Sequence, residues 1–365
     1  MKAQTETCLH NANHPNLRIL SQETVTETIF REYIIYIPQN YEENIPTPLV
    51  INMHGFGDCA SDYAETIGSF YNFNDLADQE NFIVAYPQGA YRPEKEDTYW
   101  EPGDSGTENI YENDVYFLEE LVSHISSEFN LDMDMIFACG YSNGGMMAYS
   151  LACNRSNLFT AIGIMSGTML PEECSPNRSV PMIIFHGIAD EVLPYEGSFW
   201  YQSVDEVVNF WLDKNEISPE NLVSSTLNAG NVVLDEYKDG SSCISLYTIN
   251  KEFDKPGGHV WFSENIEGEN PNSILWDFFT SNCESVSASI DPNQKEHLVF
   301  PNPFLEILTI ANSANKEYSL YDINGKVIQN GTLRSNSVLL DFSNELDGIY
   351  FLKIGEQIIK LLKSN

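Results

Sequence analysis

Positively charged side chains are scarce in this sequence of 365 residues. Lys and Arg number 18 against 54 Asp and Glu, so the formal net charge is −36 at pH 7 with His neutral. A surface of this sign repels the phosphates of nucleic acids and of anionic membranes, and we therefore expect no nucleic-acid partner. Adaptation to a salty or extracellular medium explains the acidic excess without any specific ligand.

Long hydrophobic runs are also missing. No apolar run reaches the roughly 18 residues that a membrane-spanning helix needs, so we expect no membrane span. The first residues, Met1–Thr5, lack the apolar stretch of a signal peptide. Because other features described below point to export, we expect a signal peptide upstream of this start in the precursor.

Metal-binding patterns are absent as well. The acidic runs Glu94–Asp97 and Asp132–Asp134 do not have the spacing of a calcium loop and are interpreted as solvated surface. We predict neither a metal nor another cofactor.

The seven cysteines bear on the compartment. Cys139 ends the apolar run Met135–Cys139 and is predicted to be a buried free thiol. Most of the other six fall in apparent loops, which is typical of an oxidising compartment, although reduced structural cysteines are the alternative. Six cysteines allow 15 pairings, and we single out only Cys153 with Cys174, which flank one apparent strand and loop.

From about Thr26 the sequence alternates between short apolar runs and amphipathic segments. Continuous apolar runs bounded by Gly, Pro or Asp are typical of strands buried on both faces of a parallel sheet. The pattern predicts an α/β fold with a mostly parallel central sheet. The predicted strands are Thr28–Ile37, Pro48–Met53, Phe82–Tyr86, Met135–Gly140, Ala161–Met165, Pro181–Phe185 and Ile244–Ile249, and the predicted helices are Asp114–Phe129, Gly144–Cys153, Ser203–Lys214 and Ser273–Phe279. The stretch Tyr86–Glu112 has little periodicity and is predicted to be a long loop with little regular structure, either functional or disordered.

The character of the sequence changes near residue 285. A Ser-rich stretch followed by Asp291–Gln294 predicts a linker, 285–297, between a large domain, 1–284, and a small domain, 298–365. Short runs separated by Asn-Gly and Asp-Gly turns predict a small C-terminal antiparallel β-sandwich. Its predicted strands are Leu305–Ala311, Tyr318–Tyr321, Lys326–Ile328, Ser337–Asp341, Gly348–Ile354 and Gln357–Leu362.

The segment Gly140–Gly144 has the pattern G-x-S-x-G between a predicted strand and a predicted helix. This context places a serine on a sharp turn above the sheet, with small neighbours that let the backbone make the turn. We therefore predict Ser142 as a nucleophile, the alternative being a tight strand–helix crossing without catalytic meaning.

A serine nucleophile needs a base and an orienting carboxylate, which follow it along the chain in this fold. His259 lies in a loop after the last predicted strand of the large domain and is the predicted base. Asp190, after the strand Pro181–Phe185, is the predicted acid, with Glu191 as its nearest competitor. His186 is predicted to support that loop structurally.

The oxyanion hole needs two backbone N–H groups. We assign them to Asn143, after the nucleophile, and to Phe56, in the His54–Gly57 loop, where His54 is predicted to be structural. Trp100, Trp200 and Tyr141 are the predicted substrate-binding residues. The two tryptophans would flank the cleft and stack on an acyl group or a sugar face, the alternative being ordinary core packing.

Four motifs occur in order: His54-Gly55, the segment Gly140–Met147, the segment His186–Asp190, and the segment Gly257–Trp261. Over about 28–280 the chain resembles the polyhydroxybutyrate depolymerase and feruloyl esterase lineage of α/β-hydrolases. The resemblance implies hydrolysis of carboxylic esters, either feruloyl or acetyl esters on plant polysaccharides or aliphatic polyesters.

From Val299 onward, the segments Phe300–Phe304, Tyr318–Ile328 and Gly348–Ile354 resemble the C-terminal sorting domain of the type IX secretion system. This resemblance implies export across the outer membrane of Bacteroidetes, with the secretion machinery as a partner, to a secreted or cell-surface location. A carbohydrate-binding sandwich is the alternative for this domain.

The motifs together predict a secreted serine esterase that forms an acyl-enzyme on an ester substrate. A serine peptidase of the same fold is a weaker interpretation, because the sequence has no repeats typical of a propeller domain. A polyester depolymerase and a non-catalytic surface binding protein are the remaining alternatives.

Overall fold

In the computed structural model the chain divides into two compact units, Met1–Val286 and Ser287–Asn365, and each is described by itself. The predicted linker 285–297 and residues 103–112 of the predicted long loop lie outside the described residues. The described residues are 8, 10–23, 28–93, 95–102, 114–170, 174–239, 242–250, 253, 258–281, 283, 298–300, 307–311, 316–323, 325–333, 337–342, 346, 348–354 and 357–363.

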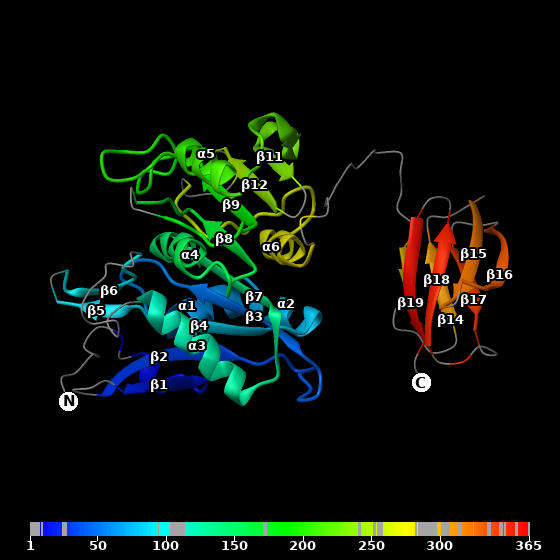
Figure 1. The fold of residues 1–365 in the computed structure, drawn as a ribbon, viewed down its shortest axis with the longest axis horizontal. Helices are drawn as coiled ribbons and strands as arrows, with labels where there is room; N and C mark the ends of the chain where they lie inside the picture. The colour runs from blue at the N-terminus through cyan, green and yellow to red at the C-terminus, as the bar shows by residue number, and fades with distance from the viewer. Residues whose placement is uncertain are drawn as a thin grey trace. The chain divides into compact units, whose positions relative to one another are not determined.

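A ten-stranded sheet forms the centre of the larger unit (Figure 1), in the order β1-β2-β4-β3-β7-β8-β9-β12-β11-β10. The six middle strands are parallel, and an antiparallel pair extends each edge. The strands are β1 (Leu17–Glu23), β2 (Thr28–Tyr36), β3 (Thr47–Met53), β4 (Ile83–Pro87), β7 (Leu131–Tyr141), β8 (Ala161–Met165), β9 (Met182–Gly187), β10 (Leu222–Leu227), β11 (Val232–Asp239) and β12 (Ser242–Ile249). The predicted α/β fold with a mostly parallel sheet is confirmed.

Helices cover both faces of this sheet (Figure 1). Apolar side chains of α3, α4 and α5 share one buried cluster with one face of the strands, whereas those of α1, η2, α2 and α6 share a second cluster with the other face. The helices are α1 (Ala60–Tyr63), the π-helical η2 (Ala64–Phe70), α2 (Phe73–Glu80), α3 (Asp114–Glu128), α4 (Asn143–Asn154), α5 (Val204–Lys214) and α6 (Pro271–Thr280), with short 3-10 turns η1 (Asn11–Asn13), η4 (Pro219–Asn221) and η5 (Asn228–Gly230).

Part of the predicted long loop is ordered as a small hairpin. Its strands are β5 (Ala90–Arg92) and β6 (Asp97–Tyr99), which pair antiparallel. The prediction of little regular structure over this stretch was wrong for these residues, because three-residue strands carry too little periodicity to be recognised in sequence.

Three disulfides close loops of the larger unit. They join Cys8 to Cys59, Cys153 to Cys174, and Cys243 to Cys283, while Cys139 is a buried free thiol. The predicted Cys153–Cys174 pair and the free Cys139 are therefore confirmed.

The smaller unit consists of two antiparallel sheets, in the orders β13-β14-β17 and β16-β15-β18-β19. Ile310 and Leu340 from the first sheet and Leu320, Leu352 and Ile354 from the second lie in one buried cluster. Two sheets with a common core form a β-sandwich, as predicted. The strands are β13 (Leu298–Phe300), β14 (Ile307–Ala311), β15 (Lys316–Asp322), β16 (Val327–Leu333), β17 (Ser337–Asp341), β18 (Gly348–Ile354) and β19 (Gln357–Lys363).

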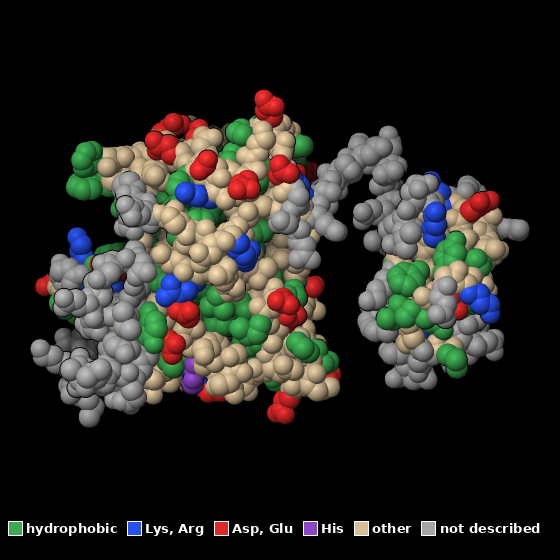
Figure 2. Space-filling model, viewed as in Figure 1, with side chains coloured by type: hydrophobic (Ala, Val, Ile, Leu, Met, Phe, Trp, Pro, Cys, Tyr) green, Lys and Arg blue, Asp and Glu red, His purple; other side chains and the backbone are tan. Residues whose placement is uncertain are grey.

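Acidic side chains are scattered over the visible face of the larger unit rather than gathered in one patch (Figure 2). Within the described residues, no helix is both long and apolar enough to span a membrane.

Candidate active site

The carboxyl ends of the parallel strands bring the predicted site residues together. Strand β3 leads into His54, β7 into Ser142, and β9 into the loop that carries Asp190. Ligands and reacting groups in open α/β sheets lie at this edge, because loops from several neighbouring strands converge there.

Ser142 lies on a strained turn between β7 and α4. Its backbone has φ 54° and ψ −117°, outside the backbone conformations that L-residues ordinarily adopt. A hydrogen bond from its N–H to the carbonyl of Met165 at 2.9 Å holds the turn against β8. The turn also needs Gly140 and Gly144, since a β-carbon on Gly140 would lie 2.4 Å from the carbonyl carbon of Gly144.

A chain of hydrogen bonds joins the three predicted catalytic residues. The Ser142 hydroxyl lies 2.9 Å from His259 Nε2, and His259 Nδ1 lies 2.7 Å from Asp190 Oδ2. Because an ionised carboxylate only accepts hydrogen bonds, Nδ1 carries the imidazole proton and Nε2 turns its lone pair toward the serine. The arrangement can abstract the serine proton.

The Asp190 carboxylate is fixed from within its own loop. Its side chain is fully buried, and Oδ1 accepts hydrogen bonds from the N–H groups of Val192 at 2.9 Å and Leu193 at 2.8 Å. Glu191, the competing candidate, is exposed. Because the two bonds to Oδ1 prevent the carboxylate from rotating, it holds His259 in one orientation.

The loop that carries His259 is held by two residues at the ends of β7 and β8. The Tyr141 hydroxyl donates to the carbonyl of His259 at 2.8 Å, and the Ser166 hydroxyl donates to the carbonyl of Val260 at 2.8 Å. Burial, followed by the charge of Asp190, raises the pKa of Tyr141 to about 12, so the phenol remains a donor. Tyr141, predicted to bind substrate, contacts the base loop, and sequence reasoning missed Ser166.

Two other histidines near the site hold the loops around it, and His186 Nε2 also lies 3.5 Å from Asp190 Oδ2. His54 donates from Nδ1 to the carbonyl of Gly55 at 2.6 Å and accepts at Nε2 from the N–H of Gly89 at 2.9 Å. His186 donates from Nε2 to the carbonyl of Leu193 at 2.9 Å. Burial lowers the pKa of both imidazoles, that of His54 to about 4. Both are therefore neutral supports of their loops.

The candidate oxyanion donors lie on two segments that touch. Gly55, which precedes Phe56, packs closely against the ring of Tyr141, since a β-carbon there would lie 3.1 Å from Tyr141 Cδ1. Asn143 begins α4 directly after Ser142. The Phe56 side chain is 53% exposed and stacks on Tyr99 with ring centroids 5.2 Å apart.

The two tryptophans that the sequence assigned to the cleft differ in environment. Trp200 is 70% exposed and packs edge-on against Phe199, with ring centroids 4.8 Å apart. Trp100 is fully buried, and its indole N–H donates to the carbonyl of His54 at 2.9 Å. A buried ring has no free face for stacking on a substrate. Trp100 therefore lies behind the site, whereas the sequence predicted it beside the substrate.

A buried ion cluster behind Trp100 was not foreseen from the sequence. Asp114 accepts from Arg31 at 2.7 Å and from Arg92 at 2.8 Å, and its own side chain has no exposed surface. Arg92 also pairs with Glu101 at 3.0 Å. Removing one partner of such a buried pair typically costs about 3–5 kcal/mol. A charged residue within an otherwise strand-like run, such as Arg31 in β2, was the available signal.

The sheet, its two helical layers and the contacting serine, histidine and aspartate define the larger unit as an α/β-hydrolase domain. Residues 30–239, more than half of the chain, match the family described as "Putative esterase". The chain belongs to this esterase family and is a carboxylic ester hydrolase.

Several known proteins are similar to the chain. Feruloyl esterase C of Emericella nidulans is 25% identical over 279 residues, which are 75% of this chain and 93% of that protein. A bifunctional acetylxylan esterase/xylanase of Neocallimastix patriciarum is 28% identical over 166 residues, 46% of this chain and 22% of that protein. The solved structure of an acetyl xylan esterase from Aspergillus awamori matches with a TM-score of 0.51 and 17% identity, covering 72% of this chain and 98% of that one, which shows a shared fold.

The smaller unit matches a different family. Residues 298–364 match the family described as "Secretion system C-terminal sorting domain". The chain is therefore an exported protein of the type IX route, as its C-terminal sequence predicted.

Proposed function

We propose that the protein is a secreted serine esterase that hydrolyses feruloyl or acetyl esters of plant polysaccharides through an acyl-enzyme. The observation that carries the proposal is the hydrogen-bonded chain from the Ser142 hydroxyl through His259 to Asp190, at 2.9 Å and 2.7 Å. The feruloyl and acetylxylan esterase names of its relatives support the substrate class.

Each residue has one role in the proposed reaction. His259 Nε2 takes the proton of Ser142 as Oγ bonds to the ester carbonyl carbon, and Asp190 stabilises the imidazolium that forms. The carbonyl oxygen becomes an oxyanion that the N–H groups of Phe56 and Asn143 stabilise. The C–O bond to the alcohol then breaks, and His259 returns its proton to the leaving oxygen.

Water completes the cycle by the same steps. His259 removes a proton from water, the hydroxyl oxygen bonds to the acyl carbon, and the second oxyanion collapses. The acid leaves, and Ser142 recovers its proton from His259. The proposed cycle consumes one ester and one water and yields one acid and one alcohol.

Trp200 is the proposed contact for an aromatic acyl group or a sugar face. Its loop reaches the carboxyl edge of the sheet, because the carbonyl of Gln202 accepts from the Thr168 hydroxyl at 2.7 Å. Thr168 follows β8, next to the nucleophile strand. The exposed indole offers one flat apolar face at this edge.

An aliphatic or aromatic polyester is the second candidate substrate. Ile188 and Val192, on either side of Asp190, are 48% and 60% exposed, and Phe199 is 85% exposed. Apolar side chains around a site favour contact with an apolar polymer. A panel of methyl ferulate, acetylated xylan and polyhydroxybutyrate separates these classes by comparing kcat/KM on each.

Hydrolysis of p-nitrophenyl acetate and butyrate by the full chain and by Ser142→Ala tests the mechanism. We expect turnover by the wild type and a loss of about 10⁴-fold or more in the variant. If the wild type had no activity, the non-catalytic binding protein would be the better description. Activity that survived in Ser142→Ala would refute the serine mechanism.

A further inference from the structure

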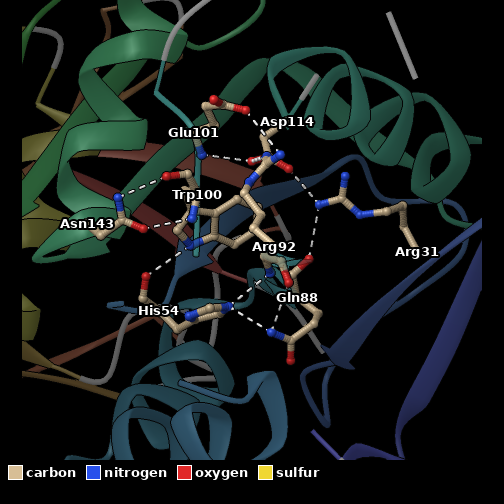
Figure 3. Close-up of polar contacts among 9 residues, drawn as sticks. Arg31, His54, Gln88, Arg92, Trp100, Glu101, Asp114 and Asn143 are labelled. Carbon is tan, nitrogen blue, oxygen red and sulfur yellow. Dashed lines mark hydrogen bonds and ion pairs between the residues drawn. The ribbon is translucent and has the colours of Figure 1, made fainter. Parts of the chain in front are cut away.

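Trp100 lies between the two backbone segments that carry the candidate oxyanion donors (Figure 3). Its indole N–H donates to the carbonyl of His54 at 2.9 Å, two residues before Phe56. The imidazole of His54 packs beside the indole, with ring centroids 5.2 Å apart. Trp100 thus holds the start of the Phe56 loop from behind.

The same residue holds the other segment through its backbone. Asn143 Oδ1 accepts from the N–H of Trp100 at 2.7 Å, and Asn143 Nδ2 donates to the carbonyl of Trp100 at 3.0 Å. This pair of bonds fixes the side chain of the residue whose own N–H is the second candidate donor (Figure 3). A paired amide contact constrains rotation as well as distance, because two bonds act at different atoms.

Neighbouring contacts prevent Trp100 from shifting. The N–H of Gly57 donates to the carbonyl of Thr98 at 2.7 Å, which is a second tie to the Phe56 loop. On the other side, the N–H of Glu101 donates to Asp114 Oδ2 at 2.9 Å, within the buried ion cluster. The chain is therefore anchored on both sides of Trp100, at Thr98 and at Glu101.

We propose that Trp100, with the side chain of Asn143, forms a brace that sets the relative position of the two oxyanion donors. Trp100 is thus a positioning residue for ester hydrolysis, and this inference rests on the proposed function. Oxyanion donors act only when they lie about 2.7–3.1 Å from the developing charge. Displacement by about 1 Å costs on the order of 100-fold in rate, so a brace at this point affects the transition state more than the bound substrate.

Trp100→Phe in the full chain tests the brace, because it keeps a buried aromatic ring and removes the indole donor. We expect kcat for p-nitrophenyl acetate to fall about 10-fold with KM within about twofold. The inhibition constant of a phenylboronic acid, which forms a tetrahedral anionic adduct with a serine, should rise by a similar factor. Titration with diethyl p-nitrophenyl phosphate counts active sites, so that a loss of folded protein is not taken for a loss of rate.

Trp276→Phe is the matched control. Trp276 in α6 is also buried and also donates one indole hydrogen bond, to Glu80 at 3.2 Å, on the face of the sheet covered by α2 and α6. Its replacement should leave kcat per active site and the boronic acid constant within about twofold of the wild type.

A second variant keeps the test decisive if Trp100→Phe does not fold. Asn143→Ala breaks both bonds to Trp100 but keeps the backbone N–H, and we again expect about a 10-fold loss in kcat. Because both residues act in one brace, the double variant should be no more than about threefold worse than the poorer single variant.

Three results would overturn the brace: kcat per active site within twofold of the wild type in both single variants, a loss confined to KM, or fully multiplicative losses in the double variant. Ser142→Ala is run alongside. If that variant kept its activity, the serine mechanism itself would fail, whereas an inactive Ser142→Ala with an unaffected Trp100→Phe rejects only the brace.

Discussion

A β-carbon at Gly144 would collide with the backbone at the end of β3. It would lie 2.1 Å from the carbonyl oxygen of Met53 and 2.6 Å from that of His54. Real β-carbons essentially never approach closer than 3.0 Å, so the start of α4 and the His54 loop would have to separate by about 0.9 Å. No side chain can rotate away, because both contacts are with main-chain atoms.

Gly144→Ala should therefore weaken both stability and catalysis. We expect a loss of about 1–3 kcal/mol in the free energy of unfolding, as for other overpacked sites. Since the same displacement separates the candidate donors of Phe56 and Asn143, kcat should fall on the order of 100-fold. Urea unfolding followed by circular dichroism measures the first effect, and hydrolysis of p-nitrophenyl acetate per titrated active site measures the second.

Gly163→Ala provides the comparison. Its β-carbon would lie 2.3 Å from Leu275 Cδ1, a similar overlap, but that atom ends a flexible side chain on α6. We expect a stability cost of about 1 kcal/mol and activity within about threefold of the wild type. If Gly144→Ala matched this control in both measurements, the close approach of α4 to β3 would not be what positions the site.

Three further predictions concern pH, the disulfides and the substrate. Burial lowers the pKa of His54 from its usual 6.5 to about 4, so between these pH values the unfolded chain binds a proton there that the folded chain does not. The free energy of unfolding should consequently fall by about 3 kcal/mol as the pH drops through this window. In urea unfolding, His54→Gln should lack this pH-dependent loss. If the variant had the same pH dependence as the wild type, His54 would not be the group responsible. Replacing Cys153 and Cys174 together by serine opens a loop with a sequence separation of 21 and should cost about 3 kcal/mol in thermal or urea unfolding, whereas a change below about 0.5 kcal/mol would argue against a stabilising cross-link. Trp200→Ala should raise KM for methyl ferulate about 3–10-fold while leaving p-nitrophenyl acetate within twofold, and equal effects on both esters would exclude a specific aromatic contact.

The elements with strong sequence signals were predicted well. The strand Ala161–Met165 is a continuous apolar run, which indicates burial on both faces of the sheet. The helix that begins at Asp114 has apolar residues at helical spacing, which indicates burial of one face. The edge strands β1 and β10 were missed, and so was β11 beside β10. In β10 most side chains are exposed, and an edge strand of this kind carries little of the apolar pattern on which the prediction depended.

Chain order and the positions of the strand ends were enough to predict the three central residues of the candidate site. Ser142, Asp190 and His259 follow three different strands. The carboxyl ends of parallel strands lie at one edge of the sheet regardless of the conformation of the loops between them. The contacts of Tyr141 and Ser166 with the base loop join residues more than 90 positions apart. Such contacts depend on loop conformations that no local pattern encodes.

The sequence by itself determined the fold class, the C-terminal β-sandwich, the buried Cys139 and the order of the candidate nucleophile, acid and base. Local periodicity, turn residues and motif spacing suffice for these, whereas the sorting role of the C-terminal domain came from its resemblance to a known family. Only the tertiary structure decided that Trp100 is buried while Trp200 is exposed, and that Asp114 pairs with Arg31 and Arg92. Burial of an aromatic ring or an ion pair is a property of what packs around it, and those partners come from distant strands.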